Sequence, residues 1–342
     1  MSDNATTPTV SALVAVYNGE RFVGETIDSI LGQTHAPDEV IVVDDGSTDG
    51  TAAVLEAFGD RIRVIRQENR GCPGAFNTAF AAARGDFLAM CGADDLWEPE
   101  KLEWQLATLR EHPQVDVSIG AARIFGAVDL MFDEPGVGLL DPQQLAQKLF
   151  PFNIVCASSI LFRRTLAEQL GPFVENTTRE ELDAFFRGLG AGDVWDAEAP
   201  GVYKERFSAD DYDYWMRALD RGAVFHYDPR TLVRYRRHED NVTNDTVWGY
   251  RSCCIVHHRH AGMIEDKALV RSVLAADLFR LGRRLEAAEL PREARTAFLA
   301  SLRQKRDPRV AAWALVTSLP DRPRRRLGPT LVSLKRAVAG SR

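Results

Sequence analysis

The chain has 342 residues, of which 45% are hydrophobic and 27% are charged, and these values are ordinary for a globular protein with a sizeable core. It carries a formal net charge of −7. No apolar run reaches the roughly 18 residues that span a bilayer, and the first residues lack the basic flank and apolar stretch of a signal peptide. We therefore expect a cytoplasmic protein.

The charge is divided unevenly along the chain. From Tyr250 onward there are 20 Lys and Arg against 8 Asp and Glu, so this part carries about +12 and the first 249 residues about −19. We therefore predict two parts, residues 1–249 and a basic C-terminal region at 250–342, with different partners. The five cysteines are odd in number and form no C-x-x-C pair, which argues against a disulfide framework or a zinc knuckle.

The first 111 residues alternate between short β-rich runs and helical patterns. The expected strands and helices are, in chain order, strand 9–16, helix 20–32, strand 39–44, a helix ending at 58, strand 61–65, helix 73–83, strand 87–92 and helix 99–111. Ser47 or Thr48 is placed to cap the second helix. This alternation predicts an α/β fold with a Rossmann-like, mostly parallel sheet and flanking helices.

The pattern loosens after His112. We expect strands at 115–119, 153–162, 223–227 and 231–236, a loop at 126–140, and helices at 163–170 and from Asp210. Residues 174–207 are acidic and poorly periodic, which suggests a lid or an insertion. After 245 the chain reads as a helical extension, with amphipathic helices at 265–288, 292–304, 308–318 and 328–339.

Acidic pairs follow two of the strands and open one helix. They are Asp44–Asp45, Asp94–Asp95 and Asp210–Asp211. The carboxyl ends of parallel strands form the ligand crevice of an open α/β sheet, and hard cations such as Mg²⁺ or Mn²⁺ prefer carboxylate and phosphate oxygens. The alternative is that Asp94 caps the following helix and Asp95 is solvated.

Several motifs together carry a family resemblance. They are Val14-Ala-Val-Tyr-Asn-Gly, Val43-Asp-Asp-Gly-Ser-Thr-Asp-Gly, Gly92-Ala-Asp-Asp-Leu-Trp, Asp210-Asp-Tyr-Asp-Tyr-Trp and Tyr235-Arg-Arg-His. In this order, over about residues 8–240, the chain resembles the family-2 inverting glycosyltransferases of the GT-A fold. The combination is far more specific than any single motif.

The resemblance implies roles for individual residues. Tyr17 would lie against the nucleobase, Asp45 would accept from its ring nitrogen, and Asp44 would lie near the base or ribose. Asp211 would be the catalytic base. The implied metal ligands, for Mn²⁺ or Mg²⁺, are Asp94, Asp95 and His238. The full donor-binding set comprises Val16, Tyr17, Asn18, Asp44, Asp45, Asn77, Asp94 and Arg237.

Three positions depart from the family pattern. Gly92 stands where the family often has the first Asp of Asp-x-Asp-Asp, Asp210 replaces the Glu of a Glu-Asp pair, and Phe76 replaces the Arg before Asn77. The base and the main metal acid remain, so we expect activity. A Gly92→Asp change should tighten metal binding.

The expected function is transfer of a sugar, with inversion, from a UDP- or dTDP-linked donor to an acceptor hydroxyl in cell-surface polysaccharide or glycoconjugate synthesis. The alternatives are a non-catalytic nucleotide-sugar-binding module and a nucleotidyltransferase. The acceptor would be a saccharide or a lipid-linked saccharide. A nucleic-acid partner is unexpected because the first 249 residues are acidic and the basic tail lacks interleaved aromatics.

The remaining features have open interpretations. The tail from Arg322 to Arg326 and the helix after it could contact the inner face of a membrane or pack in a homodimer. We interpret His257, His258 and His260 as part of a solvated helix rather than a metal site. Trp97 and Trp215 would belong to the core or to a pocket wall.

Overall fold

The structure is a computed structural model, and it describes residues 8–126, 130–131, 135–188, 209–239, 241 and 247–318. The chain divides into two compact units. The first unit comprises Met1–Glu175 with Ser208–Asn244, and the second comprises Asn176–Phe207 with Asp245–Arg342. Each unit thus joins segments that lie far apart in the sequence.

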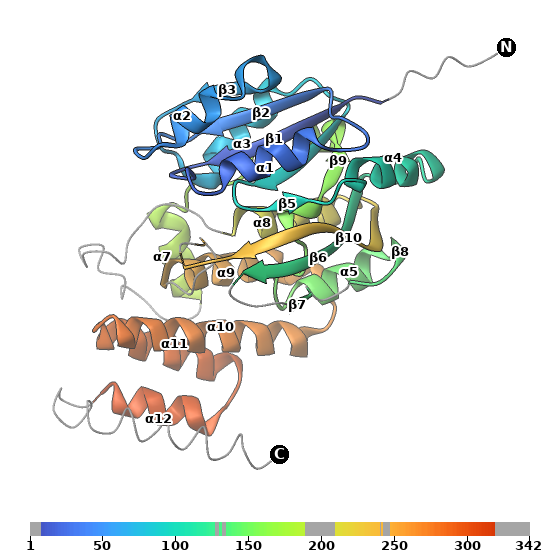
Figure 1. The fold of residues 1–342 in the computed structure, drawn as a ribbon. Coiled ribbons are helices and arrows are strands. Elements are labelled where there is room, and N and C mark those ends of the chain that lie inside the picture. The colour runs from blue at the N-terminus through green and yellow to red at the C-terminus, as the bar shows by residue number, and fades with distance from the viewer. Residues whose placement is uncertain are drawn as a thin grey trace. The chain divides into compact units, whose positions relative to one another are not determined.

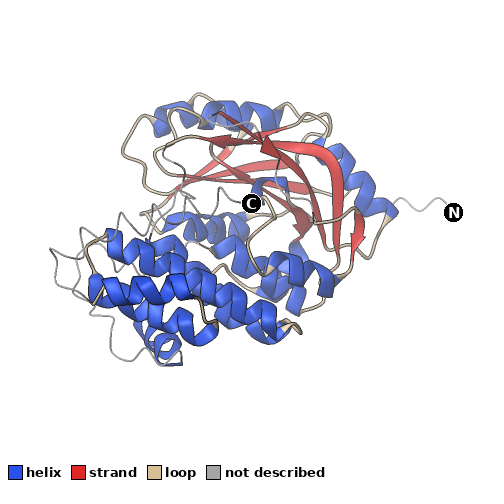
Figure 2. Cartoon of the chain, turned by 90° about the horizontal axis from the view of Figure 1, so that it is seen from below, coloured by secondary structure: helices blue, strands red, loops and turns tan. Residues whose placement is uncertain are grey.

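The first unit is built on one sheet with the strand order β3-β2-β1-β4-β9-β6-β10-β5, to which β7 and β8 are added at β6 and β10 (Figure 1). The strands are β1 (Val10–Val16), β2 (Glu39–Asp44), β3 (Arg63–Arg66), β4 (Phe87–Gly92), β5 (Leu96–Trp97), β6 (Val117–Gly126), β7 (Leu130–Met131), β8 (Gly138–Leu140), β9 (Leu161–Arg163) and β10 (Phe225–Arg237). Figure 2 shows them as one twisted sheet.

Seven helices of the described chain belong to this unit. They are α1 (Val23–Leu31), α2 (Thr51–Glu56), α3 (Gly71–Ala82), α4 (Lys101–Glu111), α5 (Pro142–Leu149), α6 (Arg164–Leu170) and α8 (Asp210–Asp220). The apolar face of α1, with Val23, Ile27 and Ile30, is fully buried in the same core as Val10 and Val14 of β1. Strands buried on both faces read as continuous apolar runs, which is why β1, β2 and β4 are recognisable in the sequence.

Parallel pairing brings the ends of these strands together. β1 pairs in parallel with β2 and with β4, so that Val16 lies opposite Asp44 and Ala15 opposite Gly92. Beyond β4 the sheet is mixed, because β9 is antiparallel to both β4 and β6, while β6 and β10 are parallel. The predicted α/β class with flanking helices is confirmed, and the half that contains β1 to β4 has its strands β1, β2, β3 and β4 all in parallel.

Two strand predictions in the second half were wrong. Residues 153–160 form no strand: residues 153–156 have no regular secondary structure and lead into a 3-10 turn at Ala157–Ser159, and only Leu161–Arg163 pairs in the sheet. The strands expected at 223–227 and 231–236 are a single strand, β10, with register shifts between Asp228 and Val233. Pro229 lies in this irregular stretch and has no N–H to donate, so the sequence indicated the end of one strand and the start of another.

The second unit is helical in the part that the structure describes. It contains α7 (Arg179–Gly188), α9 (Val247–His260), α10 (Lys267–Ala287), α11 (Pro291–Gln304) and α12 (Pro308–Val316). Asp266 caps α10 by accepting from the backbone N–H groups of Ala268 and Leu269. The helices expected at 265–288, 292–304 and 308–318 are confirmed. The helix expected at 328–339, residues 322–326 and most of the proposed lid lie outside the described residues.

Two of the three histidines of α9 are buried, whereas His258 is exposed. His257 is buried and its Nδ1 contacts the buried carboxylate of Asp277 on α10, which also pairs with Arg280. His260 is buried as well. The solvated-helix interpretation was therefore wrong for His257 and His260, because the sequence pattern does not reveal that a carboxylate of the next helix contacts His257. None of the helices that the structure describes is long and apolar enough to cross a membrane.

Candidate active site

The turn after β1 exposes Tyr17 and is braced by the turn after β2. Tyr17 is 52% exposed, whereas Val16 is buried and its carbonyl oxygen accepts from the N–H of Asp45 at 2.8 Å. Asn18 has a φ of 52°, and its side-chain oxygen accepts from the N–H of Thr48 at 2.8 Å. Ser47 also braces this turn, because its Oγ accepts from the N–H of Asn18 at 2.9 Å. Neither Ser47 nor Thr48 caps α2, which begins at Thr51, so the predicted cap was wrong.

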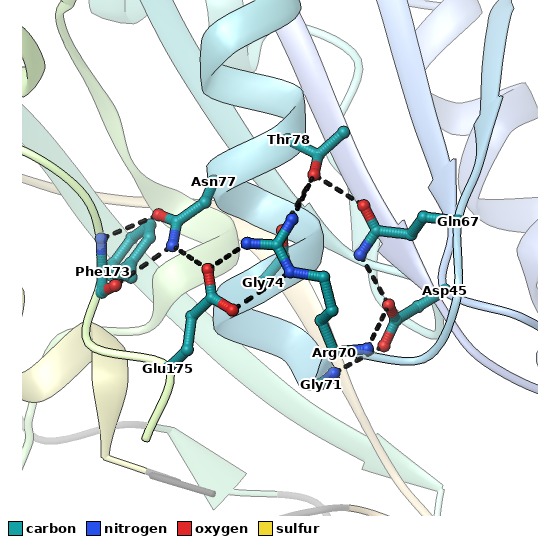
Figure 3. A network of polar contacts seen from close by, with 9 residues as sticks. All are labelled: Asp45, Gln67, Arg70, Gly71, Gly74, Asn77, Thr78, Phe173 and Glu175. Carbon is teal, nitrogen blue, oxygen red and sulfur yellow. Dashed lines mark hydrogen bonds and ion pairs between the residues drawn. The ribbon is translucent and has the colours of Figure 1, made fainter. Parts of the chain in front are cut away.

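Asp45 is buried and holds the start of α3 (Figure 3). Only 2% of it is exposed, and its carboxylate accepts from Gln67 Nε2 at 2.7 Å, from the N–H of Arg70 at 2.9 Å and from the N–H of Gly71 at 2.7 Å. A carboxylate has about four lone-pair positions, so one remains for a ligand. Asp44 is also buried and accepts from the N–H of Ser47 at 2.8 Å.

A polar network continues from Asp45 along α3 (Figure 3). Thr78 Oγ1 donates to the side-chain oxygen of Gln67 at 2.6 Å, which fixes the amide that faces Asp45. Further along, the Asn77 amide donates to Glu175 at 2.9 Å and accepts from the N–H of Phe173 at 2.8 Å. Asn77 thus holds the chain before residue 176, and its contact with a donor stays a prediction.

Asp94 and Asp95 face different partners. Asp95 is 2% exposed, and its oxygens accept from the N–H of Arg236 at 2.9 Å and from Ser158 Oγ at 2.5 Å. Burial and the charge of Asp94 raise the pKa of Asp95 to about 8. Asp94 Oδ2 lies 2.9 Å from His238 Nε2. Neither acid caps α4, whose N-cap is Glu100, so the capping alternative was wrong.

The amide of Asn241 completes the surroundings of Asp94. Its Nδ2 donates to Asp94 Oδ2 at 3.1 Å, and its Oδ1 accepts from the N–H of His238 at 2.6 Å. Arg237 is the last residue of β10 and directly precedes His238. The end of β10 is therefore fixed against the end of β4.

These groups fit a metal that arrives with its phosphates. Asp94 and His238 are partly exposed and offer oxygen and nitrogen ligands, whereas Asp95 is buried and each of its oxygens already accepts one hydrogen bond. Among the described residues no three His, Cys, Asp or Glu side chains are grouped to hold an ion. Mg²⁺ commonly takes one or two carboxylates plus substrate phosphates, so the diphosphate would supply the remaining ligands. The metal itself stays a prediction.

The third acidic pair opens α8. The carboxylate of Asp211 accepts from the N–H of Tyr212 at 2.7 Å and from Asn153 Nδ2 at 3.1 Å. Burial raises the pKa of Asp211 to about 6, and the two hydrogen bonds act in the opposite direction. Burial and the charge of Asp211 raise the pKa of Asp210 well above its usual range. Asp211 is thus ionised at neutral pH but close to its protonated form.

The acids of all three motifs meet around the first turn of α3. Cys72 is an exposed residue at the start of α3, so its thiol is only partly desolvated; desolvation and four carboxylates, those of Asp210, Asp211, Asp45 and Asp94, together raise its pKa. The fold therefore brings four acids, which are spread over more than 160 residues of the sequence, close to the same side chain, Cys72. Trp97 and Trp215 are fully buried, so they belong to the core and stack on no ligand.

Four residues of this site were not found from the sequence. They are Asn153, Ser158, Arg236 and Asn241. Each bonds a predicted site acid, but each lies in an irregular segment or acts through its backbone. Two of them lay near a recognised motif: Arg236 is part of Tyr235-Arg-Arg-His, and Asn241 comes three residues after it.

Comparison with known proteins identifies the family. The family model described as glycosyl transferase family 2 matches residues 11–171. The putative glycosyltransferase EpsE of Bacillus subtilis is 32% identical over 218 residues, which span 59% of this chain and 74% of EpsE. The chain belongs to glycosyl transferase family 2.

Solved structures agree with this glycosyltransferase in fold. TarS of S. aureus (residues 1–349, in complex with UDP-GlcNAc) is 18% identical and has a TM-score of 0.59, with 90% of this chain and 84% of TarS covered. The mannosyltransferase PcManGT of Pyrobaculum calidifontis, in complex with GDP-Man and Mn²⁺, is 19% identical with a TM-score of 0.52, covering 92% and 85%. The fold of the chain is that of the GT-A glycosyltransferases.

Proposed function

We propose that this glycosyltransferase moves a sugar from a nucleotide-diphosphate donor, UDP- or dTDP-linked, to an acceptor hydroxyl with inversion at the anomeric carbon. The observation that carries the proposal is the placement of Asp211, whose pKa is about 6, among the acids at the ends of β2 and β4. The TarS structure is in complex with UDP-GlcNAc, which supports a nucleotide-sugar donor.

The donor would lie along the ends of β1, β2 and β4. The exposed ring of Tyr17 would stack on the nucleobase, and the remaining lone pair of Asp45 would accept from it. Asp94 and His238 would hold a Mn²⁺ or Mg²⁺ ion on the diphosphate, which would neutralise the charge of the leaving group. Arg237, at the same end of β10, would add a second positive charge there.

Asp211 would act as the general base. One of its oxygens would accept the proton of the acceptor hydroxyl while that hydroxyl attacks the anomeric carbon from the face opposite the diphosphate. Attack from that face inverts the configuration. A positioned general base contributes on the order of 100- to 10,000-fold to the rate.

Replacement of the base tests the reaction. Asp211→Asn should keep donor binding and lower transfer by about 100-fold or more, because the amide cannot accept the proton. Asp220→Asn, on the exposed end of the same helix, is the matched control and should keep full activity. Release of the nucleotide diphosphate and the anomeric configuration of the product, read by NMR, are the measurements. Full transfer by Asp211→Asn would contradict the assignment.

A nucleotide-sugar panel identifies the donor. A bound donor stabilises the folded chain by mass action, so the largest rise in melting temperature, with and without Mn²⁺, indicates the preferred nucleotide and sugar. Binding of a donor without any release of nucleotide diphosphate would favour the non-catalytic module. Release of pyrophosphate from a nucleoside triphosphate and a sugar phosphate would favour the nucleotidyltransferase.

The acceptor would be a saccharide or a lipid-linked saccharide of cell-surface polysaccharide or glycoconjugate synthesis. Such an acceptor suits a cytoplasmic enzyme held at the inner face of the membrane. The basic residues after 250 supply an attraction to anionic lipid, and pairing of two copies through this region is the competing role.

A further inference from the structure

The segment between α5 and β9 contacts both the proposed catalytic base, Asp211, and the acidic pair at the end of β4. At its start, Asn153 donates from Nδ2 to Asp211 Oδ2 at 3.1 Å. Five residues later, Ser158 Oγ donates to Asp95 Oδ2 and accepts from the N–H of Gly92 at 2.9 Å. We propose that Asn153 is the positioning residue of the catalytic base: it fixes the carboxylate plane of Asp211 relative to the donor end of the site. The proposal rests on the function proposed above.

The amide of Asn153 is locked in the donating orientation. Its Oδ1 accepts from the N–H of Val155 at 3.1 Å, so its Nδ2 is the group that faces Asp211. A flipped amide would place oxygen against carboxylate oxygen and would also lose the bond to Val155. The neighbouring backbone therefore decides that Asn153 is a donor here.

The carboxylate of Asp211 accepts one hydrogen bond on each oxygen from a neighbouring residue, and its own backbone N–H adds a third. The N–H of Tyr212 donates to Oδ1 at 2.7 Å, and Asn153 donates to Oδ2. Without Asn153 the carboxylate is held by the backbone N–H groups of Asp211 and Tyr212, which both belong to the first turn of its own helix. With Asn153 it is also held from a second segment, and about one lone pair remains for the acceptor hydroxyl.

Asn153 can fix this plane because its own segment is buried and anchored. Val155 and Ser158 are almost fully buried. From α4, Gln105 Nε2 donates to the carbonyl oxygen of Ser159 at 2.9 Å, and Lys101 Nζ contacts that of Ile160 at 3.4 Å. The distance from Asp211 to Asp95 is therefore set by a short, held piece of chain.

Asn153 also keeps Asp211 ionised in acidic surroundings. The titratable groups near enough for the charge of Asp211 to act on them are Asp210 on the same helix, Cys72 at the start of α3 and Cys156 in the segment itself. Their ionised forms are all negative, so none of them favours the ionised base. The neutral amide does so by donating a hydrogen bond, and its removal raises the pKa of Asp211 further.

The test is the pH profile of Asn153→Ala. We expect kcat at pH 7 to fall about 10- to 100-fold, the donor KM to stay unchanged, and the acidic limb of kcat/KM to move up by about one pH unit. Gln147→Ala, an exposed residue of α5, is the control and should change none of these. A lower kcat with an unmoved acidic limb, or an unchanged kcat, would overturn the proposal.

A second pair of variants covers the case in which the alanine variant folds poorly. Asn153→Asp keeps the shape but sets two carboxylates together, so the acidic limb should move up further than in Asn153→Ala. The exchange N153D/D211N restores a carboxylate–amide bond and should recover the melting temperature without recovering transfer. Absence of that recovery would count against the contact. If Asp211→Asn itself kept full activity, the proposed function would fail instead.

Discussion

Asp94 and Asp95 are adjacent in the chain but have opposite surroundings. Asp94 faces His238 and Asn241 and is partly exposed, whereas Asp95 is buried between Ser158 and the backbone of β10. A strand that ends in two acids predicts a polar site there, because the strand period and the Gly-rich turn are visible in the sequence. Which acid faces the ligand depends on residues 63 and 141 positions away, so it could not be predicted.

The pKa of Asp211 sets the acidic limit of transfer. The base acts only when ionised, and its pKa is raised to about 6, so kcat/KM should rise with pH through about 6 and level off above 7. A pH series from 5 to 8 at saturating metal measures this limb. A limb near pH 4, the ordinary range of Asp, would contradict it.

The raised pKa of Asp211 also makes the free energy of unfolding depend on pH. Folding favours the protonated form of Asp211, so its contribution to the free energy of unfolding is lost as pH rises through about 6. Asp211→Asn should therefore become more stable relative to the wild type between pH 4 and pH 7. Urea unfolding at these two pH values provides the comparison.

Gly92→Asp tests the metal at the end of β4. A Cβ at position 92 would lie 3.1 Å from Asp94 Oδ1 and from Asp95 Oδ2, so a third carboxylate would crowd and repel the pair. We expect a lower melting temperature without metal and a larger rise with Mn²⁺ than in the wild type, because Mn²⁺ neutralises the added charge. Gly92→Asn has the same size without the charge and should lack the extra rise. Equal Mn²⁺ shifts in all three proteins would show that a carboxylate at position 92 does not reach the metal, and no shift in any of them would exclude a metal at the end of β4.

At the scale of elements, α4 holds the irregular segment that reaches the site. Its first residue, Lys101, is fully buried, lies 4.2 Å above the ring of Trp97 and donates to Gln105 at 2.8 Å. Burial lowers the pKa of Lys101 to about 7. A buried ammonium group is costly, and here it contacts the carbonyl oxygen of Ile160 and holds Gln105, which donates to that of Ser159.

Lys101→Met should change the pH dependence of stability. The folded chain loses the Lys101 proton near pH 7 and the unfolded chain near 10.5, so the wild type gains stability as pH rises through this interval. Between pH 6.5 and 8.5 the wild type should gain about 2 kcal/mol relative to Lys101→Met. Urea unfolding of both proteins at the two pH values measures the difference. A constant difference would show that Lys101 keeps one charge state.

The elements that could be predicted are those with a clear period. β1 to α4 follow the expected order, since buried parallel strands and amphipathic helices leave continuous patterns. Residues 153–160 were misread as a strand because they are apolar and β-branched. Their polar groups bond Asp211, Asp95 and α4 instead of a neighbouring strand. A polar contact between residues far apart in the sequence produces no periodic pattern, so Asn153 could not be predicted as the partner of Asp211.

At the scale of the whole chain, the uneven charge predicts how the protein meets a membrane. The first 249 residues carry about −19 and the rest about +12. In a flotation experiment at low salt, the full chain should float with vesicles that contain anionic lipid. Replacing Arg322, Arg324, Arg325 and Arg326 by Gln removes four positive charges and should weaken this binding. Binding that persists at high salt, or its absence at low salt, would argue against the electrostatic contact and leave homodimer formation as the alternative.

The place of Asn241 has a consequence for producing the protein. Asn241-Val-Thr is an acceptor sequence for N-linked glycans, and the glycan would attach to the same Nδ2 that donates to Asp94. Asn241 is 7% exposed, so an oligosaccharide could be added only before folding. Secretion from a eukaryotic host would then place a bulky group at the diphosphate end of the site and displace the loop after β10. A bacterial cytoplasm, which adds no such group, is the suitable compartment for expression.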